Sequence, residues 1–263
     1  MVINKFKTLL RDIIPQRLQV PVKYYFNRFS GGLEPEMEVL KYFVGKGDLV
    51  IDVGGNRGIY AYRFWKLSAT VEVFEPNINC YHVLSSWVRS KARVNVHHAA
   101  LSNLDGTALL HVPVDASGIE HDSSGSVETV ESDSTQDQQV ELRQLDGYHF
   151  EDVKFIKIDV EGHESSVIEG AAETIQSMKP SMLIEIEQRH NGMPVLEMFT
   201  KILKFGYQGY FLRKGKLVSI DDFELKRDQN PTKLSNSAEE YINNFIFIHK
   251  SKVNDFVNIL DNE

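Results

Sequence analysis

The sequence is poor in three features that mark common classes of protein: cysteine, long apolar runs and positive charge. One cysteine, Cys80, stands among 263 residues, which excludes an internal disulfide, and we expect it to pack inertly. No stretch approaches the roughly 18 apolar residues of a membrane span, and the N-terminal segment lacks the apolar core of a secretory signal. Acidic residues outnumber Lys and Arg by 37 to 29, and the formal net charge of −8 disfavours nucleic acid as a partner. These absences predict a cytoplasmic protein.

Hydrophobic residues make up 42% and charged residues 25% of the chain, a composition that excludes overall disorder and suffices for one large α/β domain. Apolar runs predict strands at 49–53, 71–75, 93–99, 154–159 and 181–187. Helical spacing of apolar residues predicts helices at 36–43, 59–67, 77–91 and 164–178. Strands that alternate with helices predict right-handed crossovers and a parallel sheet covered on both faces. Terminal strands, expected to pair antiparallel at the sheet edge, are predicted at 206–212, 216–220 and 245–248.

The two ends of the chain and one internal segment differ from the predicted main domain, which we place at 35–250. Residues 1–34 are predicted to form a basic amphipathic helical extension, because residues 1–30 carry six cations against one acid. This extension either rests on a membrane surface or an acidic partner, or packs on the body of the domain, and we favour the second. An insertion at 102–140 is predicted to include a hairpin beside the ligand pocket and is a candidate lid, and residues 251–263 form a tail.

A glycine turn follows the first predicted strand, and a carboxylate, Glu75, ends the second one 17 positions after Gly58. Gly54, Gly55 and Gly58 allow a sharp turn and a close approach to a ligand, since glycine has no Cβ. Glu75 is placed to accept both hydroxyls of a ribose. Because the turn lacks both the G-x-G-x-x-G spacing and the Lys-Ser/Thr of a phosphate loop, the pattern predicts a nucleoside without a pyrophosphate. S-adenosylmethionine fits this description.

Two groups of ionisable residues follow the fourth and fifth predicted strands, at the edge where the glycine turn lies. Asp159 and Glu161 follow one strand, and Glu187 and His190 follow the other. His190 is a candidate general base because the pKa of an unperturbed histidine lies near 6.5. Carboxylate and imidazole groups also bind divalent ions, and the pattern does not separate the two uses. We predict all four as catalytic residues and assign no metal.

At this point the chain resembles the FkbM-type S-adenosylmethionine-dependent methyltransferases. The motifs that carry the resemblance are Gly-Asp-Leu-Val-Ile-Asp-Val-Gly-Gly-Asn-Arg-Gly at 47–58, Phe-Glu-Pro-Asn at 74–77 and Ile-Lys-Ile-Asp-Val-Glu-Gly-His-Glu at 156–164. The match continues through Glu-Gly-Ala at 169–171 and covers roughly residues 35 to 190. One departure is Gly55, where the family usually has alanine, and we expect it only to loosen the turn.

The resemblance implies a class I methyltransferase fold, an α/β Rossmann-like sandwich with a mostly parallel seven-stranded sheet whose last strand is antiparallel. It also implies S-adenosylmethionine as cofactor and a hydroxyl of a small molecule, sugar or lipid-linked glycan as methyl acceptor. The residues implied to bind the cofactor are Asp52, Gly54, Asn56, Gly58, Glu75, Pro76, Asn77, Ala100, Leu101 and Asp159. Two alternatives stay open: a catalytically inactive nucleoside-binding module within a larger assembly, and a nicotinamide oxidoreductase, which the missing pyrophosphate fingerprint opposes. The sequence does not indicate an oligomeric state.

Overall fold

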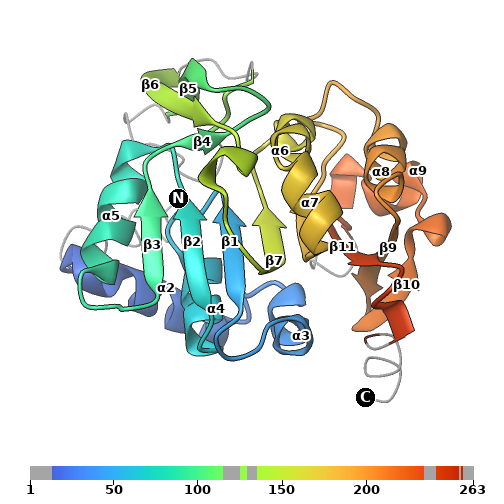
Figure 1. The fold of residues 1–263 in the computed structure, drawn as a ribbon, viewed down its shortest axis with the longest axis horizontal. Coiled ribbons are helices and arrows are strands. Elements are labelled where there is room, and N and C mark those ends of the chain that lie inside the picture. The colour runs from blue at the N-terminus through green and yellow to red at the C-terminus, as the bar shows by residue number, and fades with distance from the viewer. Residues whose placement is uncertain (1–13, 115–124, 129–134, 234–240, 255, 257–263) are drawn as a thin grey trace.

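The computed structural model describes residues 14–114, 125–128, 135–233, 241–254 and 256, folded as a sheet between two layers of helices (Figure 1). The main sheet has eight strands in the order β10-β9-β11-β8-β7-β1-β2-β3. Their bounds are β1 Leu49–Val53, β2 Thr70–Phe74, β3 Val94–His97, β7 Val153–Ile158, β8 Ser181–Glu185, β9 Tyr207–Arg213, β10 Lys216–Ser219 and β11 Asn244–His249. The predicted α/β sandwich is therefore confirmed.

Strand direction divides the sheet into a parallel part and an antiparallel edge. Strands β3, β2, β1, β7 and β8 are parallel neighbours, whereas β11 runs antiparallel to both β8 and β9. The seven strands that the family resemblance implies are one too few, because β10, the terminal strand predicted at 216–220, pairs antiparallel with β9 at the outer edge. Lys214 and Gly215 form the two-residue turn between them, with φ of +52° and +75°. Two positive φ values suit the twist of a tight hairpin, so the local sequence adds the eighth strand.

Helices cover both faces of the sheet. One face carries α2 Gln16–Ser30, α3 Glu36–Phe43, α4 Ile59–Lys66 and α5 Ile78–Val88, and the other carries α6 Glu164–Gly170, α7 Ala172–Met178 and α8 Val195–Leu203. Side chains of β1 alternate between the two layers, with Val50 packing toward α2–α5 and Ile51 and Val53 toward α6–α8. All three are at most 1% exposed, as expected of a parallel strand in the middle of a sheet. Shorter helical turns are η1 Asp146–Tyr148, η2 Ile220–Asp222, α9 Leu225–Asp228 and η3 Pro231–Lys233.

The helix predicted at 164–178 is two helices, broken at Ala171. Both oxygens of the Asp146 carboxylate accept hydrogen bonds from the first turn of α7, from the backbone N–H groups of Glu173 and Thr174, at 2.9 Å each. A carboxylate that accepts these otherwise unpaired N–H groups stabilises a new helix start. The break thus depends on a residue far away in the sequence, which helical spacing alone does not reveal.

A second, three-stranded sheet lies beyond the carboxyl ends of the main strands (Figure 1). It consists of β4 Ala100–Leu101, β6 Thr135–Arg143 and β5 Gly106–Pro113, in that order. β5 and β6 pair antiparallel over their whole length, so the hairpin predicted within 102–140 is present, and β6 continues to residue 143.

The described part of the N-terminal extension packs on the domain. α2 buries Val20 and Tyr24, which are 0% and 1% exposed, in the core that it shares with α4 and α5. Residues 1–13, with three of the six cations of the predicted extension, lie outside the described residues. Within the described ranges, no helix combines the length and the apolar character needed to cross a bilayer. The domain boundaries stay predictions.

Candidate functional site

A cleft opens at the carboxyl ends of β1, β2 and β7, beside the small sheet, and we call it the β1–β2 cleft. Its empty space is about 620 Å³, including the open mouth. Its lining residues are Val53, Gly54, Asn56, Phe74, Glu75, Pro76, Asn77, Ala99, Ala100, Leu101, Leu110, Gly125, Val127, Asp159, Val160, Glu161 and His163. Most of the residues predicted to bind the cofactor therefore lie together in one cleft.

The glycine turn forms one wall of this cleft and is tightly packed. Gly54 has φ of +78°, and a Cβ there would lie 1.8 Å from the Asp159 carbonyl oxygen. The backbone N–H groups of Gly54 and Gly55 both donate to the Phe74 carbonyl, at 2.9 and 3.1 Å. A Cβ on Gly55 would lie 2.2 Å from Cγ1 of Val73. The expectation that Gly55 only loosens the turn is wrong, because the neighbouring strand occupies the space that an alanine methyl would need.

Two predicted cofactor residues, Asp52 and Gly58, do not line the cleft. Asp52 is 0% exposed and lies within β1. Gly58 begins α4 with φ of +76°, and a Cβ on it would lie 2.7 Å from Leu84 and 3.1 Å from Val20. Gly58 thus permits close packing of α2 and α5 on the turn, and Asp52 acts behind the cleft wall.

Glu75 is held in the cleft by backbone donors. Its Oε2 accepts from the Asn56 N–H at 2.5 Å and its Oε1 from the Asn77 N–H at 2.7 Å, and the residue is 5% exposed. Asn77 also caps α5, where its Oδ1 accepts from the N–H groups of residues 79 and 80. Its Nδ2 is buried and has no hydrogen-bond partner within the described structure. A fixed carboxylate and an unsatisfied donor in one cleft fit a ligand with hydroxyl and acceptor groups, such as a nucleoside.

Behind the cleft, a buried lysine joins two predicted site residues. Lys157 is 1% exposed, and its Nζ lies 2.5 Å from Oδ2 of Asp159 and 4.7 Å from the centre of the Tyr60 ring. Asp52 is its register partner on β1. Burial alone would lower the pKa of Lys157, but the carboxylates of Asp159 and Asp52 outweigh it and raise that pKa. This ion pair holds Asp159 at the cleft.

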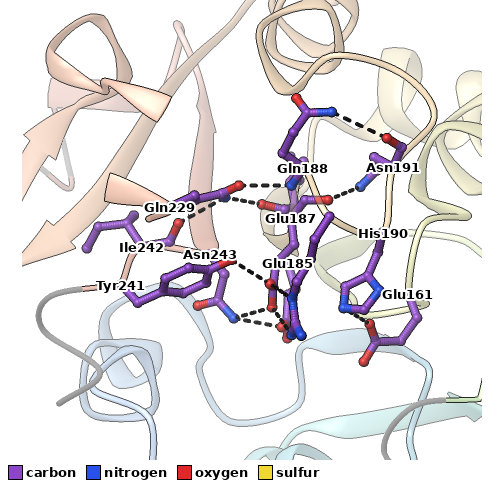
Figure 2. Close-up of polar contacts among 12 residues, drawn as sticks. Glu161, Glu185, Glu187, Gln188, His190, Asn191, Gln229, Tyr241, Ile242 and Asn243 are labelled. Carbon is purple, nitrogen blue, oxygen red and sulfur yellow. Dashed lines mark hydrogen bonds and ion pairs between the residues drawn. The ribbon is translucent and has the colours of Figure 1, made fainter. Parts of the chain in front are cut away.

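The loop after β7 brings Glu161 to His190. Glu161 Oε2 lies 3.2 Å from His190 Nε2, a close polar contact whose geometry falls short of a hydrogen bond (Figure 2). Gly162 allows the approach, since a Cβ on it would lie 2.2 Å from the His190 carbonyl oxygen. The pKa of Glu161 is raised to about 8, mainly by burial and to a lesser extent by the nearby charges of Asp159 and Glu187. Burial and Arg189 lower the pKa of His190, so this imidazole is neutral at pH 7.

Glu187 faces a different cleft, which we call the acidic cleft, at the carboxyl end of β8. Its empty space is about 1020 Å³, including open solvent. The lining residues are Glu34, Pro35, Glu36, Glu185, Glu187, Arg189, Leu212, Lys214, Gly215, Tyr241, Ile242, Asn243 and Asn244. The predicted grouping of Glu187 with Asp159 is therefore wrong in geometry, because the two carboxylates line separate clefts.

The Glu187 carboxylate is surrounded by donors (Figure 2). It accepts from the guanidinium of Arg189, from the Tyr241 hydroxyl at 2.8 Å and from Asn243 Nδ2 at 3.2 Å. Burial would raise the pKa of Glu187, but the hydrogen bonds from Arg189 and Tyr241 outweigh burial and lower it. A carboxylate that is ionised and fully engaged in this way is a poor general base. Among the described residues, moreover, no group of three or more His, Cys, Asp or Glu side chains is arranged to hold a metal ion.

Several lining residues were not predicted from the sequence. Residues 125–128, between β5 and β6, reach the loop after β7: Ser126 Oγ donates to the Glu161 carbonyl at 2.7 Å, and Glu128 Oε1 lies 2.7 Å from Nδ1 of His163. The predicted hairpin thus does lie beside the cleft, and its role as a lid stays a prediction. The sequence did point to His163, since it stands within the motif of residues 156–164.

The acidic cleft combines segments from both ends of the chain. Glu34 accepts from the Tyr60 hydroxyl and from Asn244 Nδ2, and Glu185 accepts from Asn243 Nδ2 at 2.7 Å. No local pattern joins residue 34 to residues 241–244, so sequence spacing gave no indication of this site.

Comparison with known proteins gives a match to one family model and a likeness of fold to solved structures. The family model described as Methyltransferase FkbM domain matches residues 52–210, more than half of the chain. Among solved structures, an FkbM methyltransferase from Methylobacillus flagellatus KT is 16% identical, with 82% of this chain and 51% of that chain covered and a TM-score of 0.50. This chain therefore spans about half the length of that protein, and the likeness shows the fold alone. No curated protein sequence matches significantly.

Two further structures resemble the chain. An rRNA methylase from Streptococcus thermophilus is 10% identical, with 82% of this chain and 97% of that chain covered and a TM-score of 0.47. A protein from Streptococcus mutans described as a methyltransferase, in complex with SAH, is 9% identical, with 82% and 98% covered and a TM-score of 0.46.

Proposed function

This chain belongs to the FkbM methyltransferase family and uses S-adenosylmethionine, and we propose that it methylates a hydroxyl oxygen of a polar acceptor bound in the acidic cleft. The observation that carries the proposal is the arrangement of the two clefts. Both lie at the carboxyl edge of the sheet, and Glu161, which lines the β1–β2 cleft, feels the charge of Glu187 in the acidic cleft. A methyl donor in one cleft and an acceptor in the other would meet at the loop after β7.

The β1–β2 cleft would hold the cofactor. Glu75, fixed by two backbone donors, would bind the ribose hydroxyls, and the Gly54 turn would allow close approach of the ligand. The bound cofactor supplies an electrophilic methyl group on a sulfonium sulfur. Asp159, held in place by Lys157, would stand at the junction of the two clefts.

The chemistry of the acidic cleft favours a hydroxyl-rich acceptor such as a sugar, a polyol or the head of a lipid-linked glycan. The carboxyl groups of Glu34, Glu36 and Glu185 line it, and the Oδ1 of Asn244 is buried without a partner within the described structure. These groups accept hydrogen bonds, and hydroxyl groups donate them. A ligand that offers several hydroxyl donors matches such a wall.

Glu161 is the best-placed proton acceptor for the reaction. As the oxygen–methyl bond forms and the sulfur–methyl bond breaks, the hydroxyl proton must leave, and the Glu161 carboxylate would take it. A positioned base of this kind contributes on the order of 10²–10⁴-fold to the rate. His190, 3.2 Å away, would position the carboxylate and share its proton. Because the pKa of Glu161 is about 8, its basic form increases as the pH rises toward that value.

The test is methyl transfer from isotopically labelled S-adenosylmethionine to a panel of sugars, polyols and glycolipids, with the product methyl ether identified by mass spectrometry. We expect transfer to oxygen in the wild type and in Glu197→Ala, an exposed acid of α8, and its loss in Glu161→Ala. Binding of S-adenosylhomocysteine without transfer to any hydroxyl compound would instead indicate a catalytically inactive nucleoside-binding module.

A further inference from the structure

An apolar stripe runs along the outer side of α2. Leu18, Val22, Tyr25 and Phe29 recur at i, i+4, i+7 and i+11, which places them on one face of a helix. They are 46%, 43%, 38% and 84% exposed. The face that holds Val20 and Tyr24 is packed against α4 and α5, so α2 carries apolar residues on two sides and buries one. A helix that only packed on the domain would need no second apolar face.

The charged residues of α2 itself are of one sign. Residues 14–30 contain Arg17, Lys23 and Arg28 and no acidic residue, in a chain with a net charge of −8. Lys66 of α4 adds a fourth cation, because its Nζ lies 3.0 Å from the hydroxyl of Tyr25. Within the described residues, α2 therefore combines an apolar stripe with cations and carries no acid.

A groove beside the stripe continues the same chemistry. It has about 850 Å³ of empty space between α2, α4 and the end of α5, and its charged lining residues are Arg17, Arg89 and Lys91, all cations. Trp65 and Trp87 supply its aromatic wall, and the Nζ of Lys91 lies 4.7 Å from the centre of the Trp65 ring. Aromatic rings next to cations are typical of surfaces that contact the headgroup region of a bilayer.

We propose that the stripe of α2 and the adjoining groove form a docking surface for an anionic lipid bilayer. The apolar stripe would enter the boundary between headgroups and acyl chains, and the neighbouring cations would contact lipid phosphates. This proposal does not depend on the identity of the methyl acceptor. Its one link to the β1–β2 cleft is that α2 contacts the glycine turn, where Arg57 donates to Gln19 of α2 at 3.3 Å.

The test is flotation of the full chain with vesicles of phosphatidylcholine alone or with added phosphatidylglycerol. We expect binding to the anionic vesicles, weaker binding to the neutral ones, and release at high salt, which screens exposed charges. The double variant Leu18→Ser/Phe29→Ser should bind anionic vesicles at least about tenfold more weakly. The control Leu109→Ser/Leu196→Ser, which alters exposed leucines of β5 and α8, should bind as the wild type does.

Two further measurements keep the outcome decisive. Titration with S-adenosylhomocysteine reports whether each variant keeps its folded cofactor cleft, and it separates a failure of this proposal from a failure of the proposed function. Arg17→Glu/Arg89→Glu should lose binding to anionic vesicles while keeping cofactor affinity. Equal binding to both kinds of vesicle, no binding to either, or self-association of the chain that Phe29→Ser abolishes would overturn the proposal.

Discussion

The β1–β2 cleft and the acidic cleft lie at the same edge of one sheet but are built by different parts of the chain. In the first, backbone groups fix the functional carboxylate: Glu75 accepts from two N–H groups that belong to the turns beside it. In the second, side chains do so: Glu187 is held by Arg189, Tyr241 and Asn243. Backbone groups keep their positions when side chains are substituted, so a site formed by them suits a ligand that stays the same. A site formed by side chains can acquire specificity for another ligand through substitution. We therefore expect acceptor specificity to reside in the acidic cleft.

The same comparison explains why two nearby carboxylates differ in protonation. Burial and like charges raise the pKa of Glu161, whereas hydrogen bonds from Arg189 and Tyr241 outweigh burial and lower that of Glu187. Environments that separate the pKa values of neighbouring acids also separate their roles. Glu161 is thus suited to proton transfer and Glu187 to holding a ligand or a wall in place.

The largest effect is expected from removing the buried cation behind the β1–β2 cleft. Lys157→Met leaves the Asp52 and Asp159 carboxylates without their counter-charge, and loss of one partner of a buried pair costs about 3–5 kcal/mol. Urea unfolding should show this loss of stability. The matched variant Lys154→Met removes an exposed ion pair with Asp152 and should cost less than about 1 kcal/mol. Equal losses in the two variants would contradict the role of the buried pair.

The next largest effects are on kcat and KM, and they distinguish the roles of the two clefts. Glu161→Gln should lower kcat about 10²–10⁴-fold and keep its affinity for S-adenosylhomocysteine, because the lost group acts on the acceptor proton. Glu187→Gln should mainly raise KM for the acceptor. The kcat of the wild type should rise with pH through about 8, the pKa of Glu161, and the variant should lack this rise. If Glu161→Gln kept the wild-type pH profile, another residue would be the base.

Much of the β1–β2 cleft could be predicted because its residues are close in sequence. The helix at Glu36–Phe43 and the strand at Leu49–Val53 have the predicted bounds, and the spacing from Gly58 to Glu75 indicated two adjacent strand ends. The acidic cleft could not be predicted, since Glu34 meets Asn244 only through the fold. Sequence position put Glu187 at the correct edge of the sheet, but it did not show that the side chain lies among Arg189 and Tyr241.

The tight packing around Gly55 could not be predicted, although this residue lies within a recognisable motif. Gly55→Ala should destabilise the protein by about 1–3 kcal/mol, because the new methyl overlaps Cγ1 of Val73. The cost should be smaller in a Val73→Ala background, which a double-mutant cycle measures. The control is Gly192→Ala, where nothing lies within 4 Å of the added Cβ. Independent, additive effects of the two substitutions would show that the contact is not the cause.

A further effect is expected on stability as a function of pH. Burial raises the pKa of Asp52 to about 6, of Glu36 and Glu164 to about 7 and of Glu161 to about 8. Above their usual pKa, near 4, these groups are ionised in the unfolded chain but still protonated in the folded one. The folded state then binds more protons, so the free energy of unfolding falls as the pH rises.

Thermal unfolding between about pH 6 and pH 8 measures this slope, and a change of 1 kcal/mol corresponds to about 2–4 °C in Tm. Glu164→Gln should flatten the slope, because an amide in place of a buried carboxyl has no proton to lose. Glu197→Gln, at an exposed position, should leave it unchanged. A Tm that rises over this range would mean that the buried carboxyls are ionised in the folded protein.

The assignment of the cofactor to one cleft and the acceptor to the other is tested most directly by calorimetry. The wild type, Glu75→Ala and Glu187→Ala are each titrated with S-adenosylhomocysteine. We predict that Glu75→Ala weakens binding at least about tenfold, since it removes a charge-assisted acceptor, and that Glu187→Ala binds as the wild type does. Equal weakening in both variants, or none in Glu75→Ala, would contradict the assignment of the β1–β2 cleft to the cofactor and of the acidic cleft to the acceptor.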